Sequence, residues 1–304
     1  MGILQILTHD RLKMTPASTF PVRPERDSSP QLQERCLSPS FTVISDPADP
    51  RVEPFLDVRE RDLVGRRGLF VAEGEVVLRH LLASPLCEPV ALLAAADRAE
   101  RLAELIGQNG AATPVYVAEQ KVMDAIVGFP IHRGLLGLGR RRAIPSASRL
   151  IEGLGPRARV AVVHGVGNHD NMGGLFRNAA AFGVDAVLLD PTCCDPLYRK
   201  ALRVSVGAAL ITPYARLEPA DDLVGLLEGA GFEVVALSPS GRQDLKDYRP
   251  AARTAVVFGA EGPGLPPDIL SRCATLRIPM AGGFDSLNVA TTSGIVLHHL
   301  TSRP

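Results

Sequence analysis

The second half of the chain is built from short apolar runs that are separated by helix-like segments. The clearest run covers residues 158–163 and is almost continuously apolar, which is typical of strands buried on both faces of a parallel sheet. We expect further strands at residues 186–189, 208–211, 233–237, 255–258 and 275–278. Because strands that alternate with helices form layered structures, the pattern predicts an α/β domain with a parallel sheet.

A smaller α/β pattern lies between residues 41 and 140. It opens with an apolar strand at residues 69–73, which ends in Gly74 and leads into an apolar helix. Further elements are expected in the order strand 90–94, helix 97–109, strand 114–118, helix 119–126 and strand 134–138. This alternation again indicates a small layered α/β domain.

Two segments lack such periodicity. Residues 1–40 are rich in Pro, Ser and charge, so we expect a disordered extension. Residues 141–157 contain arginines, prolines and glycines and are expected to be a basic linker to the domain at 158–304. A cluster of arginines in and beside this linker suits phosphate binding and a solvated connector equally well: Arg140, Arg141, Arg142, Arg149, Arg157 and Arg159.

Composition narrows the class of protein. The apolar fraction of 46% supports buried cores, and no apolar run reaches the roughly 18 residues that cross a bilayer. The five cysteines are scattered without C-x-x-C spacing, which favours a reducing cytoplasm and structural thiols over disulfides or a metal site. A cytoplasmic protein without membrane or metal partners is therefore expected.

The first of three motifs covers residues 171–179, Asn-Met-Gly-Gly-Leu-Phe-Arg-Asn-Ala. Asp170 and Asn171 are good capping residues, so a helix is expected to begin after them. Its apolar residues recur at the i, i+3, i+4 spacing of a core-facing stripe. Arg177 lies about 130° from the centre of that stripe at about 100° per residue, and it therefore points away from the core, as an ordinary surface arginine would.

The second motif covers residues 258–265, Phe-Gly-Ala-Glu-Gly-Pro-Gly-Leu, and follows an apolar strand. Its three glycines bracket Glu261, and glycines let a backbone pass close to a ligand. A purely structural tight turn would use the same residues. Pro266 and Pro267 suit the first turn of a following helix.

The third motif covers residues 278–289, in which a short strand runs through a glycine loop into the last helix. Ser286 is expected to cap that helix. Asn288 offers both donors and acceptors at the positive end of the helix. A further loop after a strand, residues 237–241 (Leu-Ser-Pro-Ser-Gly), is less specific.

In this order, the three motifs resemble the signatures of the SpoU (TrmH-type) RNA 2'-O-ribose methyltransferases of the SPOUT superfamily. The resemblance covers residues 158–304 and implies a SPOUT-type parallel sheet with a trefoil knot, a feature that general folding rules would not predict. It also implies S-adenosylmethionine as cofactor, RNA (rRNA or tRNA) as partner and a homodimer whose subunits share active-site groups. Residues 69–74 and 132–136 look like parts of the small ribosomal-protein-like substrate-binding domain that often precedes this fold.

The resemblance also assigns roles to individual residues. It implies that the catalytic residues are Arg177, Asn171, Ser286, Asn288 and Glu261. It implies that the cofactor is held by Leu237, Ser238, Gly259, Glu261, Gly264, Ile278, Met280 and Leu287. Because a guanidinium stays protonated at neutral pH, Arg177 could act as a base or as an electrostatic stabiliser of the 2'-oxygen. No metal is required, because a sulfonium methyl group is already activated.

Three rival functions are open from sequence. One is methylation of a base rather than a ribose, which the same fold would allow although the motifs favour the ribose. Gly165 and Gly167, with Asp190 as the ribose-binding acid, resemble part of the Rossmann fingerprint of a dinucleotide-binding oxidoreductase, although Asp170 stands at the third glycine position. A non-catalytic RNA-binding or ribosome-assembly factor could share the SpoU fold. Loss of Arg177, Asn171 or Asn288 would favour that alternative, and all three residues are present.

Overall fold

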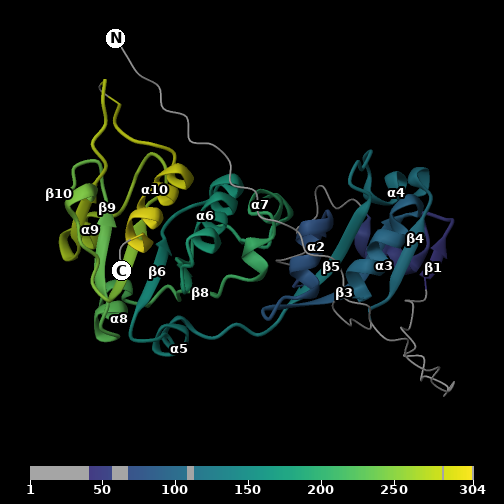
Figure 1. Cartoon of the computed structure of the whole chain (residues 1–304), viewed down its shortest axis with the longest axis horizontal. Coiled ribbons are helices and arrows are strands. Elements are labelled where there is room, and N and C mark those ends of the chain that lie inside the picture. Colours follow the sequence, from purple (N-terminus) through teal and green to yellow (C-terminus); the bar gives the residue numbers. More distant parts are fainter. Residues whose placement is uncertain (1–40, 57–67, 108–112, 283, 303–304) are drawn as a thin grey trace, which may run out of the picture. The chain divides into compact units, whose positions relative to one another are not determined.

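The computed structural model describes residues 41–56, 68–107, 113–282 and 284–302. These residues form two sheets with helices packed against them (Figure 1). The segment 1–40, for which disorder was expected, lies outside the described residues. No helix in the described ranges is long and apolar enough to cross a membrane.

The smaller sheet has the strand order β1-β4-β3-β5-β2. Strands β1, β4 and β3 are parallel, whereas β5 runs antiparallel to both of its neighbours. Its elements are β1 (Phe41–Ile44), η1 (Pro50–Phe55), β2 (Leu69–Glu73), α2 (Glu75–Leu82), β3 (Cys87–Ala95), η2 (Ala96–Arg98), α3 (Ala99–Gly107), β4 (Val115–Ala118), α4 (Gln120–Val127) and β5 (Leu135–Arg141). Side chains of α2 and α3 are buried on one face, and those of α4 and η1 on the other.

The larger sheet has the order β10-β12-β9-β11-β6-β7-β8, and every neighbouring pair is parallel. The parallel α/β arrangement expected for this half is confirmed. Its elements are α5 (Ala147–Glu152), β6 (Ala158–Val163), α6 (His169–Ala181), β7 (Ala186–Leu189), α7 (Arg199–Val204), η3 (Ala208–Leu210), β8 (Tyr214–Arg216), α8 (Leu223–Gly229), β9 (Glu233–Leu237), β10 (Gln243–Asp244), η4 (Leu245–Asp247), β11 (Arg253–Phe258), α9 (Pro267–Arg272), β12 (Ala274–Arg277) and α10 (Val289–Thr301).

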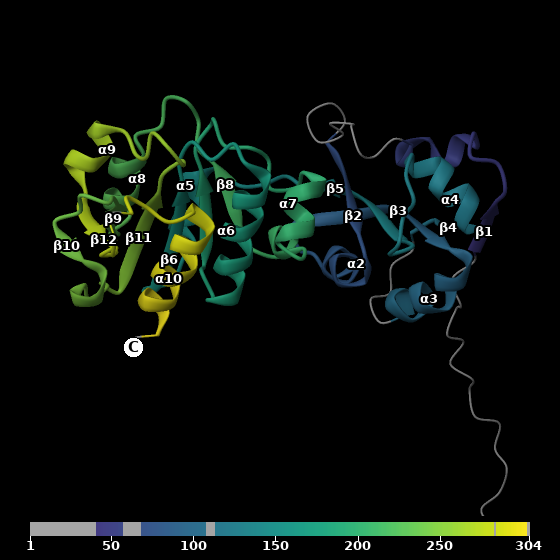
Figure 2. The same cartoon turned by 90° about the horizontal axis from the view of Figure 1, so that it is seen from above.

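Alternate residues of these strands enter two different cores. In β6, Ala161 and Val163 pack with α6, α7 and α10, whereas Val160 and Val162 pack with α5, α8 and α9. Figure 2 shows α6 and α10 on one side of the sheet and α8 and α9 on the other. Helices on both faces explain why the strands read as continuous apolar runs rather than as alternating ones.

The run at 208–211 is not the strand that was expected. Ala208 to Leu210 form the 3-10 helix η3, and the strand is the shorter β8, Tyr214–Arg216. Gly207, at φ 80°, turns the chain immediately before η3. A run of four apolar residues is compatible with a buried turn as well as with a strand, since burial satisfies both.

The segment expected to be a linker contains helix α5. Its Ala147 and Ile151 are only 3% and 1% exposed, and they belong to the core on the α8 and α9 face of the larger sheet. Ser146 caps the helix by accepting a hydrogen bond from the backbone N–H of Arg149. Much of this segment is therefore packed structure rather than a flexible connector.

Most of the clustered arginines contact protein groups. Arg140 pairs with Glu88 at 3.3 Å, and Arg141 pairs with Asp195 at 2.6 Å. Arg142 donates to the carbonyl of Cys87, and Arg159 donates to the carbonyls of Ala251, Ala252 and Leu300. Within the described residues, the guanidinium groups of Arg149 and Arg157 make no such contact, so the phosphate-binding hypothesis is best retained for these two.

Candidate active site

The carboxyl ends of four neighbouring strands meet at one edge of the larger sheet. Strands β12, β9, β11 and β6 are parallel and adjacent in that order. The loops after β9, β11 and β12 and the turn from β6 into α6 therefore leave the sheet at the same edge. These segments carry the three motifs and the serine-containing loop, and this edge is the usual ligand site of open parallel sheets.

A cavity of about 340 Å³ lies among these loops. Every residue expected to hold the cofactor lines it: Leu237, Ser238, Gly259, Glu261, Gly264, Ile278, Met280 and Leu287. Ser286 lines it as well. Its volume lies within the range of small-molecule sites, and its walls are mainly apolar side chains and glycine backbone.

The second motif forms a tight loop whose backbone is part of the cavity wall. A side-chain carbon on Gly259 would lie 2.7 Å from the carbonyl carbon of Gly264, so only glycine fits there. Gly264 donates its backbone N–H to the carbonyl of Ala260 at 3.1 Å. Gly262 and Gly264 have φ values of 86° and 70°, which glycine adopts without strain.

Asn288 joins the three motifs through one side-chain amide. Its Nδ2 donates to Oδ1 of Asn171 at 2.8 Å and to Oε1 of Glu261 at 2.7 Å. Its Oδ1 accepts the backbone N–H groups of Ala290 and Thr291 at the start of α10. Asn171 is 6% exposed, so the amide pair is held in a partly buried position.

These contacts correct the two expected helix caps. Helix α6 begins at His169, and its cap is Asn168, which accepts from the N–H groups of Asp170 and Asn171. Helix α10 is capped by Asn288, and Ser286 lines the cavity instead. Asparagine and serine cap equally well in isolation, so sequence did not distinguish the candidates.

Arg177 makes no hydrogen bond or ion pair with the other expected catalytic residues. It is exposed on α6, it does not line the cavity, and it makes no hydrogen bond or ion pair with any described residue. Met172, Leu175 and Phe176 are buried on the opposite side of the helix, as the periodicity predicted. The structure thus links Asn171, Asn288 and Glu261 by hydrogen bonds, Glu261 and Ser286 line the cavity, and Arg177 belongs to neither set.

Helix α6 contacts α10 through residues that the sequence did not single out. Nδ2 of Asn178 donates to the carbonyl of Ala290 at 2.7 Å and to the hydroxyl of Ser293 at 2.9 Å. A side-chain carbon on Gly174 would lie 2.5 Å from Cβ of Ala290. This close approach fixes the start of α10, and with it Asn288, relative to Asn171. The adjacent glycines 173 and 174 were the one available signal of it.

At the N-terminal end of α6, one side chain packs against an aromatic ring and another forms an ion pair. The ring of His169 lies against Tyr198 with a centroid separation of 4.3 Å, and Lys200 pairs with Asp170 at 2.6 Å. Burial, and then the charge of Lys200, lower the pKa of His169 below its usual value. The imidazole at this helix start is therefore neutral at neutral pH.

Comparison with known proteins places these motifs in a family. Residues 158–298 match the SpoU rRNA Methylase family. The chain is 41% identical over 268 residues to an uncharacterised tRNA/rRNA methyltransferase of Mycobacterium bovis, which covers 85% of this chain and 91% of the relative. The chain belongs to the SpoU rRNA methylase family. The resemblance inferred from the three motifs is therefore confirmed.

Two further rRNA methyltransferases are similar to this chain, one in sequence and one in fold. The 23S rRNA (guanosine-2'-O-)-methyltransferase of Vibrio parahaemolyticus is 33% identical over 137 residues, 45% of this chain and 56% of the relative. The crystal structure of an AdoMet-bound rRNA methyltransferase from Sinorhizobium meliloti superposes with a TM-score of 0.71. It covers 85% of this chain and 97% of that chain, at 23% identity.

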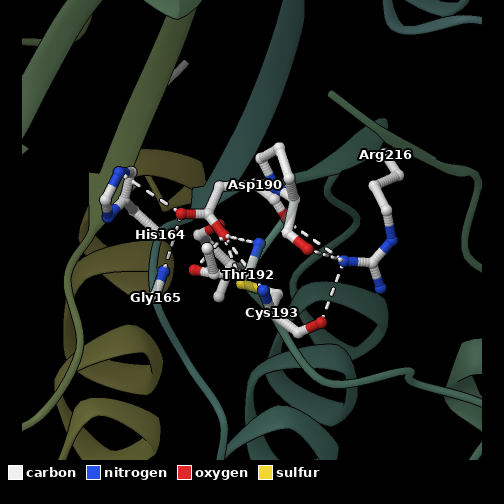
Figure 3. Close-up of polar contacts among 8 residues, drawn as sticks. His164, Gly165, Asp190, Thr192, Cys193 and Arg216 are labelled. Carbon is white, nitrogen blue, oxygen red and sulfur yellow. Dashed lines mark hydrogen bonds and ion pairs between the residues drawn. The ribbon is translucent and has the colours of Figure 1, made fainter. Parts of the chain in front are cut away.

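In this SpoU methylase, Asp190 is occupied by protein contacts rather than free to bind a ribose. The residue is 4% exposed, and its carboxylate accepts the backbone N–H groups of Gly165, Thr192 and Cys193 at 2.7–3.1 Å (Figure 3). His164 Nε2 lies 3.3 Å from the same carboxylate. Asp190 therefore ties the ends of β6 and β7 together, and the Rossmann hypothesis loses its ribose-binding acid.

The neighbouring cysteines are free thiols, of which Cys193 is buried and Cys194 is half-buried. The thiol of Cys193 donates to the carbonyl of Val163, and burial raises its pKa to about 12. Burial also raises the pKa of Cys194, to about 11. Within the part of the chain that the structure describes, no group of three or more His, Cys, Asp or Glu side chains is placed to hold a metal ion.

Proposed function

We propose that this chain transfers a methyl group from S-adenosylmethionine to a ribose 2'-hydroxyl of structured RNA, either rRNA or tRNA. The observation that carries the proposal is the link from Asn288 to Asn171 and Glu261 beside a cavity lined by the second and third motifs. Relatives named as tRNA/rRNA methyltransferases, and one named as a guanosine-2'-O-methyltransferase, support the choice of substrate.

The residues of the cavity fit the proposed cofactor. Ile278, Met280 and Leu287 supply an apolar wall suited to a flat adenine ring. The backbone of the second motif approaches closely because Gly259 has no room for a side chain. When bound, S-adenosylmethionine supplies a methyl group on a positively charged sulfur, which is an activated donor.

In this proposal, the chain's own residues position the acceptor oxygen and stabilise its charge. The amide pair Asn171–Asn288 is fixed at both ends, so its remaining polar atoms can orient the ribose without reorganisation. Arg177 contacts the 2'-oxygen or the adjacent phosphate and favours the developing negative charge. Because Arg177 is exposed and makes no hydrogen bond or ion pair with the linked Asn171, Asn288 and Glu261 of its own chain, we propose that it acts in the site of a second subunit.

Two further family features belong to the same proposal. Residues 41–140 act as the RNA-reading domain. The guanidinium groups of Arg149 and Arg157, which make no hydrogen bond or ion pair with a described residue, are available to bind phosphates. The C-terminal segment is threaded as a trefoil knot, which brings the third motif beside the second.

Ligand binding and methyl transfer together test this function. Calorimetry should detect binding of S-adenosylmethionine and no binding of NAD. Incubation with methyl-labelled cofactor and RNA from cells that lack the gene should then yield label on a ribose. Binding of NAD without a response to S-adenosylmethionine would contradict the proposal, as would label found only on a base.

A further inference from the structure

The charged residues of the cavity all have one sign. Among the described residues that line it, Glu261 and Asp285 carry charge, and none is Lys, Arg or His. The remaining lining residues are apolar side chains, glycines and hydroxyl side chains. The wall of the site thus carries two carboxylates that no cation in the lining balances.

The described residues of the same chain leave these charges unneutralised. Glu261 accepts a hydrogen bond from the Asn288 amide, which is a neutral donor and does not cancel the charge. Asp285 is exposed, and it makes no hydrogen bond or ion pair with any described residue. Its carboxylate therefore remains available to a ligand in the cavity.

The donor and the product of methyl transfer differ in net charge. S-adenosylmethionine carries a sulfonium and an ammonium group against one carboxylate, so it has a net positive charge. S-adenosylhomocysteine has lost the sulfonium charge and is neutral overall. A wall with two unbalanced carboxylates attracts the first more strongly than the second.

We propose that Asp285, together with Glu261, makes the cavity select the cationic methyl donor over its neutral product. This inference rests on the proposed function. Asp285 is a specificity-determining residue here: it favours replacement of spent product by fresh donor without taking part in methyl transfer. Since Asp285 is exposed and screened by water, its contribution to this preference is about 2- to 5-fold.

Calorimetry on the full chain with three ligands tests the proposal. The ligands are S-adenosylmethionine, S-adenosylhomocysteine and sinefungin, in which an amine supplies the positive charge in place of the sulfonium. For Asp285→Asn, we expect affinity for the two cationic ligands to fall about 2- to 5-fold and affinity for S-adenosylhomocysteine to change less than about 1.5-fold. The loss should shrink at high salt, because salt screens exposed charges.

Asp247→Asn is the matched control. Asp247 is an exposed acid on η4, which packs near the C-terminal end of α10, whereas the cavity is lined by Val289 and Thr292 at the opposite end. It should leave all three affinities unchanged. Asp285→Ser repeats the test if the asparagine variant has a lower melting temperature than the parent.

The outcomes are separable. If Asp285→Asn weakens the neutral product as much as the cations, or weakens none of the ligands, the charge-selection proposal is wrong while the methyltransferase function stands. If the parent protein binds none of the three ligands, the proposed function fails and this inference fails with it.

Discussion

Asn288 is the residue on which the candidate site depends most, because its amide serves three motifs at once. Asn288→Asp keeps an oxygen to cap α10 but removes both Nδ2 donors and places a second carboxylate beside Glu261. Because aspartate caps helices as well as asparagine does, we expect the cap to be kept and the melting temperature to fall less than in Asn288→Ala, by the repulsion between the two carboxylates alone. Methyl transfer should fall at least about 100-fold, as when a positioned donor is lost.

Thermal melting and single-turnover methylation measure these two effects separately. Asn288→Ala removes the cap as well, so it should lose both stability and activity. Near-normal turnover by Asn288→Asp would show that its amide donors do not position the reacting groups.

Arg177 should separate chemistry from cofactor binding. Because its side chain does not line the cavity, Arg177→Ala should leave the affinity for S-adenosylmethionine unchanged. Methyl transfer should fall at least about 100-fold, since a charge-stabilising group is removed from the reacting site. Arg177→Lys should recover little activity, because a point charge does not reproduce the planar guanidinium. A normal kcat for the Arg177→Ala variant would show that Arg177 is an ordinary surface arginine without a catalytic role.

The placement of individual residues at the cavity was predictable from sequence only where a motif fixed it. The residues expected at the cofactor all line one cavity, because each motif is short and follows a strand of one sheet. The caps were not predictable, since Asn168 and Asn288 each compete with an equally good neighbour. Nothing local indicated that Arg159 donates to carbonyls of residues 251, 252 and 300, because that contact depends on the folded chain.

At the scale of elements, the close crossing of α6 and α10 holds the site together. Gly174→Ala would place a methyl group 2.5 Å from Cβ of Ala290, so α10 must move, and Asn288 with it. We expect a loss of about 1–3 kcal/mol of stability from overpacking and a clear loss of methyl transfer. Chemical denaturation and methylation assays on the same preparation measure both.

Gly229→Ala is the matched control for that substitution. Gly229 ends α8. Apart from its chain neighbours and the nearby backbone of the same helix, no atom lies within 4 Å of a side-chain carbon added there. Alanine there should be neutral or slightly stabilising, because it lowers the entropy of the unfolded chain. If Gly174→Ala proves as stable and active as Gly229→Ala, the helix crossing does not position Asn288.

Elements were predictable where apolar runs were long and uniform. Strands β6, β9 and β11 were expected because both faces are buried and their sequences are continuously apolar. The run at 208–211 and the helix α5 were misassigned for opposite reasons. The first is apolar, but Gly207 at φ 80° turns the chain into a 3-10 helix there, and the second is a six-residue helix amid Pro, Gly and Arg.

At the scale of the whole molecule, the proposed sharing of sites between subunits predicts complementation. Arg177→Ala and Asn288→Ala should each be inactive alone. Mixed and refolded together, they should regain about a quarter of parental activity, because half of randomly formed dimers are mixed and each mixed dimer has one intact site. Titration of the mixing ratio measures this. No recovery in a mixture shown to contain mixed dimers would place Arg177 in the site of its own chain.

The central claim is that this site methylates a ribose in RNA. Ribose 2'-O-methyl groups block alkaline cleavage at the adjacent phosphate, so they can be mapped across all rRNA and tRNA of the parent strain and of a deletion strain. We predict that at least one protected ribose in the parent becomes cleavable in the deletion strain. The parental gene should restore its protection, and the Arg177→Ala gene should not. Identical maps from the two strains would contradict the claim.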